Sequence, residues 1–141
     1  MYSFEGTCII LCIILHERIH ERVHVFFDVF FDVLFHVLPE NGTNICKRIH
    51  GHTFNLTVHI RGNIDPNTGF IIDFFDIDEI VNSKIISIID HKLLNEIKGL
   101  ENPTSEHLTK WIWNNLKHTM NGLSKIVLSE DHGTGIEFSG E

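Results

Sequence analysis

The chain has 141 residues, of which 43% are hydrophobic and 21% charged, and its formal net charge is −8. This length favours one globular domain with its own core, and the acidic balance without a basic stripe argues against a nucleic-acid-binding protein. Three cysteines without a regular spacing favour a reducing, cytoplasmic compartment over secretion.

The first part of the chain consists of short sequence units that each occur twice. The stretches CIILCIIL, HERIHERV and VFFDVFFDV follow one another between residues 8 and 33. The apolar run at residues 8–15 is too short to span a bilayer, so we predict no membrane association. We divide the chain into an atypical repeat-containing segment, residues 1–30, and a folded domain, residues 31–141.

These repeats also suggest one class of enzyme. His16, Glu17 and His20 match H-E-x-x-H, and the next repeat, residues 20–24, matches it again. On a helix, histidines four residues apart can hold zinc while the glutamate serves as general base, as in a metalloprotease. A tandem repeat produces this spacing by itself, however, so the alternative is a solvated helical turn of alternating charge.

Beyond the repeats, hydrophobic periodicity predicts the elements of a small α+β domain. Strands are predicted at residues 26–37, 54–62, 125–128 and 135–138. Helices are predicted at residues 76–89, with Asp76 and Glu79 as a capping box, and at residues 103–121, with Pro103 near the first position. The apolar face of the first helix is predicted to consist of Ile77, Ile80, Val81, Ile85 and Ile88. This order predicts an antiparallel four-stranded sheet with two helices on one face.

The stretch CKRIHGHTFNLTVHI, residues 46–60, carries a candidate metal site. Its alternation, extended backwards, places His50 and His52 on the same side of a strand, where two imidazoles can converge on a tetrahedral zinc ion. Gly51 lets the backbone come close to such an ion, and Cys46 is near enough to reach the same pocket. The alternative is a pair of histidines that merely caps a strand.

More motifs follow in a fixed order, namely GNIDPNTGFIIDF, IDHKLLN, GLENPTSEHLTKWIWNNLK, an acidic SED turn and a C-terminal GIEFSGE. Together with His36 and CKRIHGHTF, they resemble the 6-pyruvoyl- and 6-carboxy-tetrahydropterin synthase family over residues 36–141. The resemblance is strongest to the bacterial carboxy branch, which serves queuosine (7-deazaguanine) synthesis. It implies the tunnelling fold, in which subunits form homo-oligomers with active sites between neighbours.

The resemblance also implies a reaction at a metal centre. Zn²⁺ would be held by His36, His50 and His52, and would act as a Lewis acid on the side-chain oxygens of 7,8-dihydroneopterin triphosphate. The products would be 6-carboxy-5,6,7,8-tetrahydropterin, acetaldehyde and triphosphate. Alternatives are a 6-pyruvoyl-tetrahydropterin synthase and a catalytically impaired pterin- or metal-binding relative, because bulky residues precede His36 where the family has small ones.

Four further residues take roles from the same resemblance. Cys46 would remove protons from the substrate, and Asp90 would orient His91. Glu130 would hold the amino-pyrimidine edge of the pterin and share in proton transfer. Considered singly, Asp90 and His91 could instead be a helix C-terminus, and Glu130 a solvated turn carboxylate.

Overall fold

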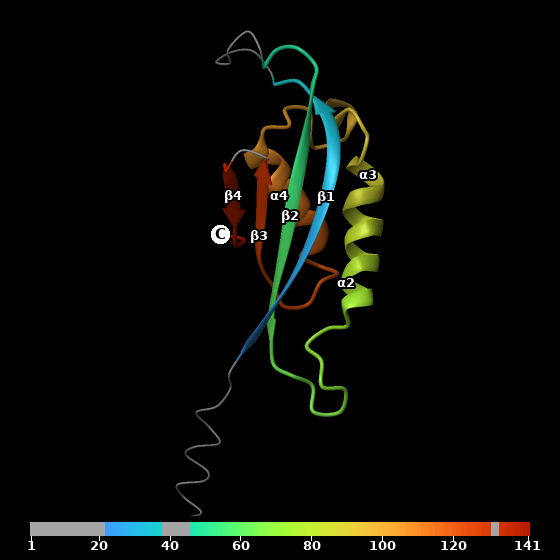
Figure 1. Cartoon of the computed structure of the whole chain (residues 1–141), viewed down its shortest axis with the longest axis vertical. Coiled ribbons are helices and arrows are strands. Elements are labelled where there is room, and N and C mark those ends of the chain that lie inside the picture. Colours follow the sequence, from blue (N-terminus) through green and yellow to red (C-terminus); the bar gives the residue numbers. More distant parts are fainter. Residues whose placement is uncertain (1–21, 38–45, 131–132) are drawn as a thin grey trace, which may run out of the picture.

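The computed structural model describes residues 22–37, 46–130 and 133–141, and its centre is a four-stranded antiparallel sheet in the order β1-β2-β3-β4 (Figure 1). The strands are β1 Val23–Phe35, β2 His50–Gly62, β3 Leu123–Glu130 and β4 Gly135–Phe138. β1 and β2 pair along their whole length, from Val23 opposite Gly62 to Phe35 opposite His50. The predicted α+β fold is confirmed, since helices complete the structure.

The helical segments come between β2 and β3 in the sequence. They are α2 Phe74–Val81, the π-helical turn η1 Asn82–Ile86, α3 Ser87–Ile89, the 3₁₀ turn η2 Leu94–Glu96, and α4 Ser105–Leu116. α2, η1 and α3 form one continuous helix beside β1, while α4 lies behind the sheet against β3 and β4 (Figure 1). The two helices predicted from the sequence therefore correspond to α2–α3 and α4.

Two details of the first helix differ from the prediction. The helix begins earlier, because Asp73 rather than Asp76 caps it and accepts a hydrogen bond from the Phe75 N–H at 2.9 Å. Its buried residues recur at every fourth position, namely Ile77, Val81, Ile85 and Ile89, while Ile88 is exposed. The π-helical turn widens the helix in its middle, so the apolar face follows a longer repeat than the predicted one.

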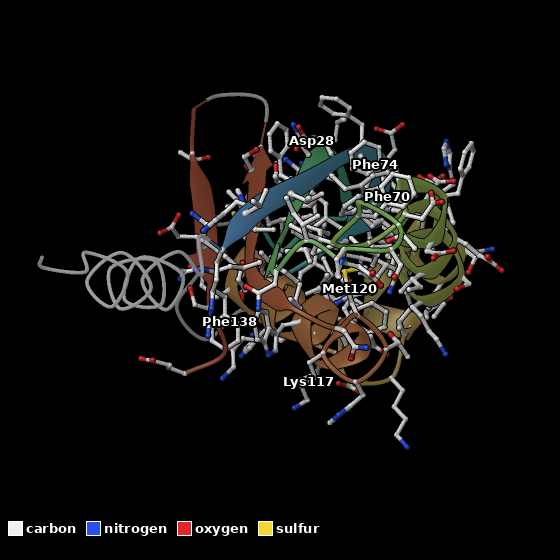
Figure 2. The ribbon with its side chains drawn as sticks, turned by 90° about the horizontal axis from the view of Figure 1, so that it is seen from below. Asp28, Phe70, Phe74, Lys117, Met120 and Phe138 are labelled. Carbon is white, nitrogen blue, oxygen red and sulfur yellow. The ribbon has the colours of Figure 1, made fainter. Side chains whose placement is uncertain are left out.

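One face of the sheet is buried against the helices and the other is not. On β1 the odd-numbered residues Phe31, Val33 and Phe35 are buried, while Phe26 and Phe30 on the other face are exposed. Figure 2 shows Asp28 at the outer side of the sheet, away from the buried Met120. The strict alternation of side chains along a strand produces this division.

The first H-E-x-x-H match, residues 16–20, lies outside the described residues, as do His20 and Glu21 of the second. The last histidine of the second match, His24, belongs to β1 and pairs with Arg61, so it is not on the helix that a metalloprotease motif requires. None of the helices in the described part of the chain is long and apolar enough to cross a membrane.

Candidate active site

A cavity of about 610 Å³ lies where β1 ends and β2 begins. Its walls consist of Asp32, Val33, Leu34, Gly51, His52, Thr53, His91 and Glu130. Three of the predicted site residues, His52, His91 and Glu130, therefore meet at one cavity although they lie far apart in the sequence. His36, Cys46 and His50 are not among its lining residues.

Glu130 ends β3 at the wall of this cavity. Its Oε1 accepts a hydrogen bond from the Ser105 hydroxyl at 3.1 Å, and its Oε2 lies 3.7 Å from His52 Nδ1. Ser105 is the first residue of α4, whose N-terminal dipole favours a nearby carboxylate. Glu130 also lines a second hollow of about 260 Å³ with Leu128 and Ile136. Its carboxylate thus lies between two hollows.

Asp90 and His91 follow α3 and are held against β1 by backbone hydrogen bonds. The His91 N–H donates to the Asp32 carbonyl at 2.7 Å, and the Leu34 N–H donates to the Lys92 carbonyl at 3.0 Å. His91 has a φ of 57°, a left-handed conformation that side chains other than glycine rarely adopt. This sharp turn brings the Asp90 carboxylate to 3.0 Å from His91 Nδ1.

Burial acts to raise the pKa of Asp90, but the hydrogen bond from the Asp32 backbone N–H and the contact with His91 outweigh it. The pKa of Asp90 is therefore held below its ordinary value of 3.8. With its carboxylate ionised at neutral pH, Asp90 can fix which ring nitrogen of His91 carries the proton. The other nitrogen, Nε2, then remains available to exchange a proton with a ligand.

Replacing Asp90 by asparagine is expected to lower the free energy of unfolding at neutral pH, by less than about 1 kcal/mol because the pair faces solvent. Since the pKa is lower in the folded than in the unfolded protein, the carboxylate stabilises the folded state above pH 3.8. This contribution disappears as the pH falls through the lowered pKa. Urea unfolding between pH 7 and pH 3 measures it, with Asp78→Asn on the exposed side of α2 as control. An Asp90→Asn deficit that grows toward pH 3 would contradict this assignment.

The structure adds Asp32 to this group, a residue that the sequence did not single out. Its carboxylate lies 4.0 Å from His91 Nε2 and accepts a hydrogen bond from the Thr53 hydroxyl on β2. Its backbone N–H donates to Asp90 at 3.0 Å. Asp32 therefore touches both members of the Asp90–His91 pair. In the sequence, Asp32 is marked only by its position among the alternate residues of β1 that face solvent.

His50 and His52 lie on the same face of β2, as the strand phase predicted, with ring centroids 4.9 Å apart. The Nδ1 of His50 lies 2.8 Å from the Arg48 carbonyl. Since a carbonyl oxygen can only accept, Nδ1 carries the ring proton and Nε2 is left as an acceptor. On β1, Phe35 is directly opposite His50. The Phe35 ring lies 4.7 Å from the ring of His50 and 5.2 Å from that of His52.

His36 and Cys46 lie together just past the end of β1. The Val37 N–H donates to the Cys46 carbonyl at 2.9 Å. The Asn95 side chain holds the backbone of His36 on both sides, accepting from its N–H at 3.0 Å and donating to its carbonyl at 2.8 Å. Asn95 is thus a positioning residue that the motif IDHKLLN contained without revealing its role.

The predicted zinc site requires three donor side chains that lie close enough together to bind one metal ion. Among the described residues, no group of three or more His, Cys, Asp or Glu side chains is arranged to share a metal ion. His50 and His52 form a suitable pair of donors, but His36 does not join them as a third. The three-histidine set therefore does not fit the described geometry, and the ligand role of His36 stays a prediction.

Comparisons with known proteins agree on one family. The model of the family described as 6-pyruvoyl tetrahydropterin synthase matches residues 27–141. A protein of Archaeoglobus fulgidus, provisionally named 6-carboxy-5,6,7,8-tetrahydropterin synthase, is 36% identical over 90 residues, which are 64% of this chain and 75% of that protein. Dihydroneopterin monophosphate aldolase of Pyrococcus furiosus is 32% identical over 94 residues, 64% of this chain and 78% of the relative. The structure of Caenorhabditis elegans 6-pyruvoyl tetrahydropterin synthase has a TM-score of 0.76 at 20% identity, covering 85% of this chain and 96% of that one.

Proposed function

Because the chain belongs to the 6-pyruvoyl tetrahydropterin synthase family, we propose that it is a lyase acting on 7,8-dihydroneopterin triphosphate. The products we propose are 6-carboxy-5,6,7,8-tetrahydropterin, acetaldehyde and triphosphate, formed in queuosine (7-deazaguanine) biosynthesis. The observation that carries the proposal is the meeting of His52, His91 and Glu130 at one cavity. The name of the Archaeoglobus fulgidus relative supports the carboxy product.

Glu130 is the residue proposed to bind the pterin ring. An ionised carboxylate offers two acceptor oxygens to the ring N–H and amino group of an amino-pyrimidine, which is a paired recognition. The hollow beside Glu130 has apolar walls from Leu128 and Ile136, which suit a flat ring. A ring bound there would direct its side chain toward the larger cavity, which His52 and His91 line.

Cys46 and the Asp90–His91 pair are proposed to move protons on the substrate side chain. Cys46 is half-buried beside the end of β1, and we assign it as the base that removes a proton. Asp90 orients His91, whose side chain is 75% exposed and so is accessible to a bound substrate. The lowered pKa of Asp90 keeps its carboxylate ionised, so His91 can accept a proton and return it.

Zinc is the metal we propose for this enzyme, with His50 and His52 as its ligands. Their imidazoles lie together on one strand, and nitrogen donors of this kind suit zinc. The roles given to Cys46, His91 and Glu130 follow from their own chemistry and do not require a metal at a stated position.

We further propose that the enzyme is a cytoplasmic homo-oligomer with active sites between subunits. β1 is an edge strand of thirteen residues. Among the described residues, the bridge on its outer edge is the parallel one between Leu34 and Leu93, near the end of the strand. Long edges of this kind invite pairing with a second chain. The exposed rings of Phe26 and Phe30 beside this edge support the same proposal.

The product distinguishes the branches of the family. Three residues separate Cys46 from His50, the spacing that resembles the carboxy branch. Incubating the purified protein with 7,8-dihydroneopterin triphosphate is expected to release acetaldehyde and triphosphate in equal amounts. Acetaldehyde is measured with alcohol dehydrogenase and NADH. Turnover to a pyruvoyl product without acetaldehyde would overturn the assignment, as would cleavage only of a monophosphate substrate.

The binding role of Glu130 is tested separately from turnover. Glu130→Ala is expected to weaken binding of a non-reactive pterin at least about tenfold, because the charged hydrogen bonds are lost. Glu137→Ala on β4 removes an exposed carboxylate and serves as the matched control. Unchanged pterin affinity in Glu130→Ala would remove Glu130 from the binding site.

A further inference from the structure

The position on β1 that faces the two imidazoles is held by a phenylalanine. Phe35 pairs with His50 and is only 4% exposed, and its ring contacts both His50 and His52. Val33, on the same face of β1, is directly opposite His52, so Val33 and Phe35 are the two β1 residues opposite the histidine pair. The next residue, His36, follows the end of the strand in the opposite phase.

The phase of β1 is set by the strand's own sequence. Its inward positions carry only apolar residues, Val25, Phe27, Val29, Phe31, Val33 and Phe35. Its outward positions include Asp28 and Asp32, which accept hydrogen bonds from Thr57 and Thr53 of β2. Shifting the strand by one residue would turn His36 inward, but it would also bury both carboxylates and break both hydrogen bonds. This change is strongly unfavourable.

Hydrogen bonds at the end of β1 also oppose a local rearrangement that would turn His36 inward. Asn95 binds both the N–H and the carbonyl of His36, and it donates to the Glu101 carbonyl at 3.2 Å. The Leu34 N–H is bound to the Lys92 carbonyl. An extra residue inserted into the strand here would sacrifice the hydrogen bonds of Leu34 and His36, which hold the end of β1 to the segment after α3.

We infer that the metal site of this chain is a two-imidazole site made by His50 and His52, which Phe35 closes to a third histidine, and that His36 is not a ligand. A zinc site of high affinity has three or four protein ligands. This site has two, so we expect its zinc affinity to be low. The inference concerns the metal of the proposed function, but it rests on strand phase alone. Its test therefore measures metal binding rather than turnover.

The experiment is a zinc titration of the metal-stripped full-length protein, read by competition with a chromophoric chelator. His50→Ala is expected to lower zinc affinity at least about tenfold, as removal of a ligand does. His36→Ala is expected to leave it unchanged, because the contacts of His36 with Asn95 are made by its backbone. A loss in His36→Ala as large as that in His50→Ala would overturn the inference.

A gain-of-binding variant provides the second arm. Phe35→His is expected to raise zinc affinity at least about tenfold, and bound Co²⁺ should then show the intense visible absorption of a tetrahedral site. Phe30→His, on the outer face of the same strand, is the control and should leave affinity unchanged. Circular dichroism establishes that both variants are folded. If folded Phe35→His gains no affinity, the inference fails; if it does not fold, the comparison of His36→Ala with His50→Ala still decides.

Discussion

Replacing Cys46 by alanine is expected to abolish turnover of 7,8-dihydroneopterin triphosphate while the fold is retained. A positioned base contributes about 10²–10⁴ to a rate, so kcat should fall by at least about 100-fold. The thiol is half-buried beside the end of β1, and its backbone carbonyl accepts from the Val37 N–H. That backbone hydrogen bond persists in alanine, which is why the local structure should survive.

Steady-state release of triphosphate measures this loss, and pterin affinity should stay within about twofold because Glu130, not Cys46, is assigned to the ring. Lys47→Ala, an exposed neighbour on the same turn, is the matched control. Cys46→Ser should restore little activity, since a hydroxyl is a much weaker acid than a thiol. If Cys46→Ala keeps more than about a tenth of wild-type turnover, the base lies elsewhere.

The largest effect on stability is expected for Phe54→Ala. Phe54 is 1% exposed and packs among Phe31, Phe35 and His52, with ring centroids 5.6, 6.4 and 6.0 Å away. Removing a fully buried aromatic ring costs about 3–5 kcal/mol, because transfer energy is lost and a cavity remains. A domain of this size is stable by about 5–15 kcal/mol, so the variant should be close to unfolding at physiological temperature.

Chemical denaturation at one protein concentration measures this difference. Phe75→Ala is the control, because Phe75 is 84% exposed near the start of α2, and its effect should stay within about 0.5 kcal/mol. A Phe54→Ala variant that unfolds within about 1 kcal/mol of wild type would mean that its neighbours collapse into the cavity. His52 would then move, and zinc affinity should change in parallel.

Local patterns in the sequence were enough to predict the sheet and the helices. The alternation in β2 and the cluster of turn residues at 65–69 each act over a few residues, and β4 has the predicted bounds. The helix cap at Asp73 was missed because Asp76 offered an equally good pattern three residues later. The shift of the apolar face to Ile89 depended on a π-helical turn, for which the sequence carries no simple signal.

The site was less accessible from the sequence, because its contacts join distant parts of the chain. Asp32 meets Asp90 across 58 positions, and His36 meets Asn95 across 59. No periodicity connects such residues. The motifs pointed to His52, His91 and Glu130, which line one cavity, while their catalytic roles stay predictions. The prediction that included His36 followed the order of the motif, whereas the phase of β1 decides which residue faces the histidine pair.

The VFFD repeat within β1 has a consequence for how the sheet assembles. A displacement of β1 by four residues would again place Val and Phe inside and an aspartate opposite a threonine, because Asp28 and Asp32 are spaced as Thr57 and Thr53 are. The β1–β2 pair by itself therefore distinguishes poorly between these two alignments. The distinction comes from Asn95, which binds the backbone of His36, and from Asp90, which accepts from the backbone N–H of Asp32. The segment after α3 thus fixes the alignment of β1. A chain whose strands pair in the displaced alignment before that segment docks must separate them and pair them again.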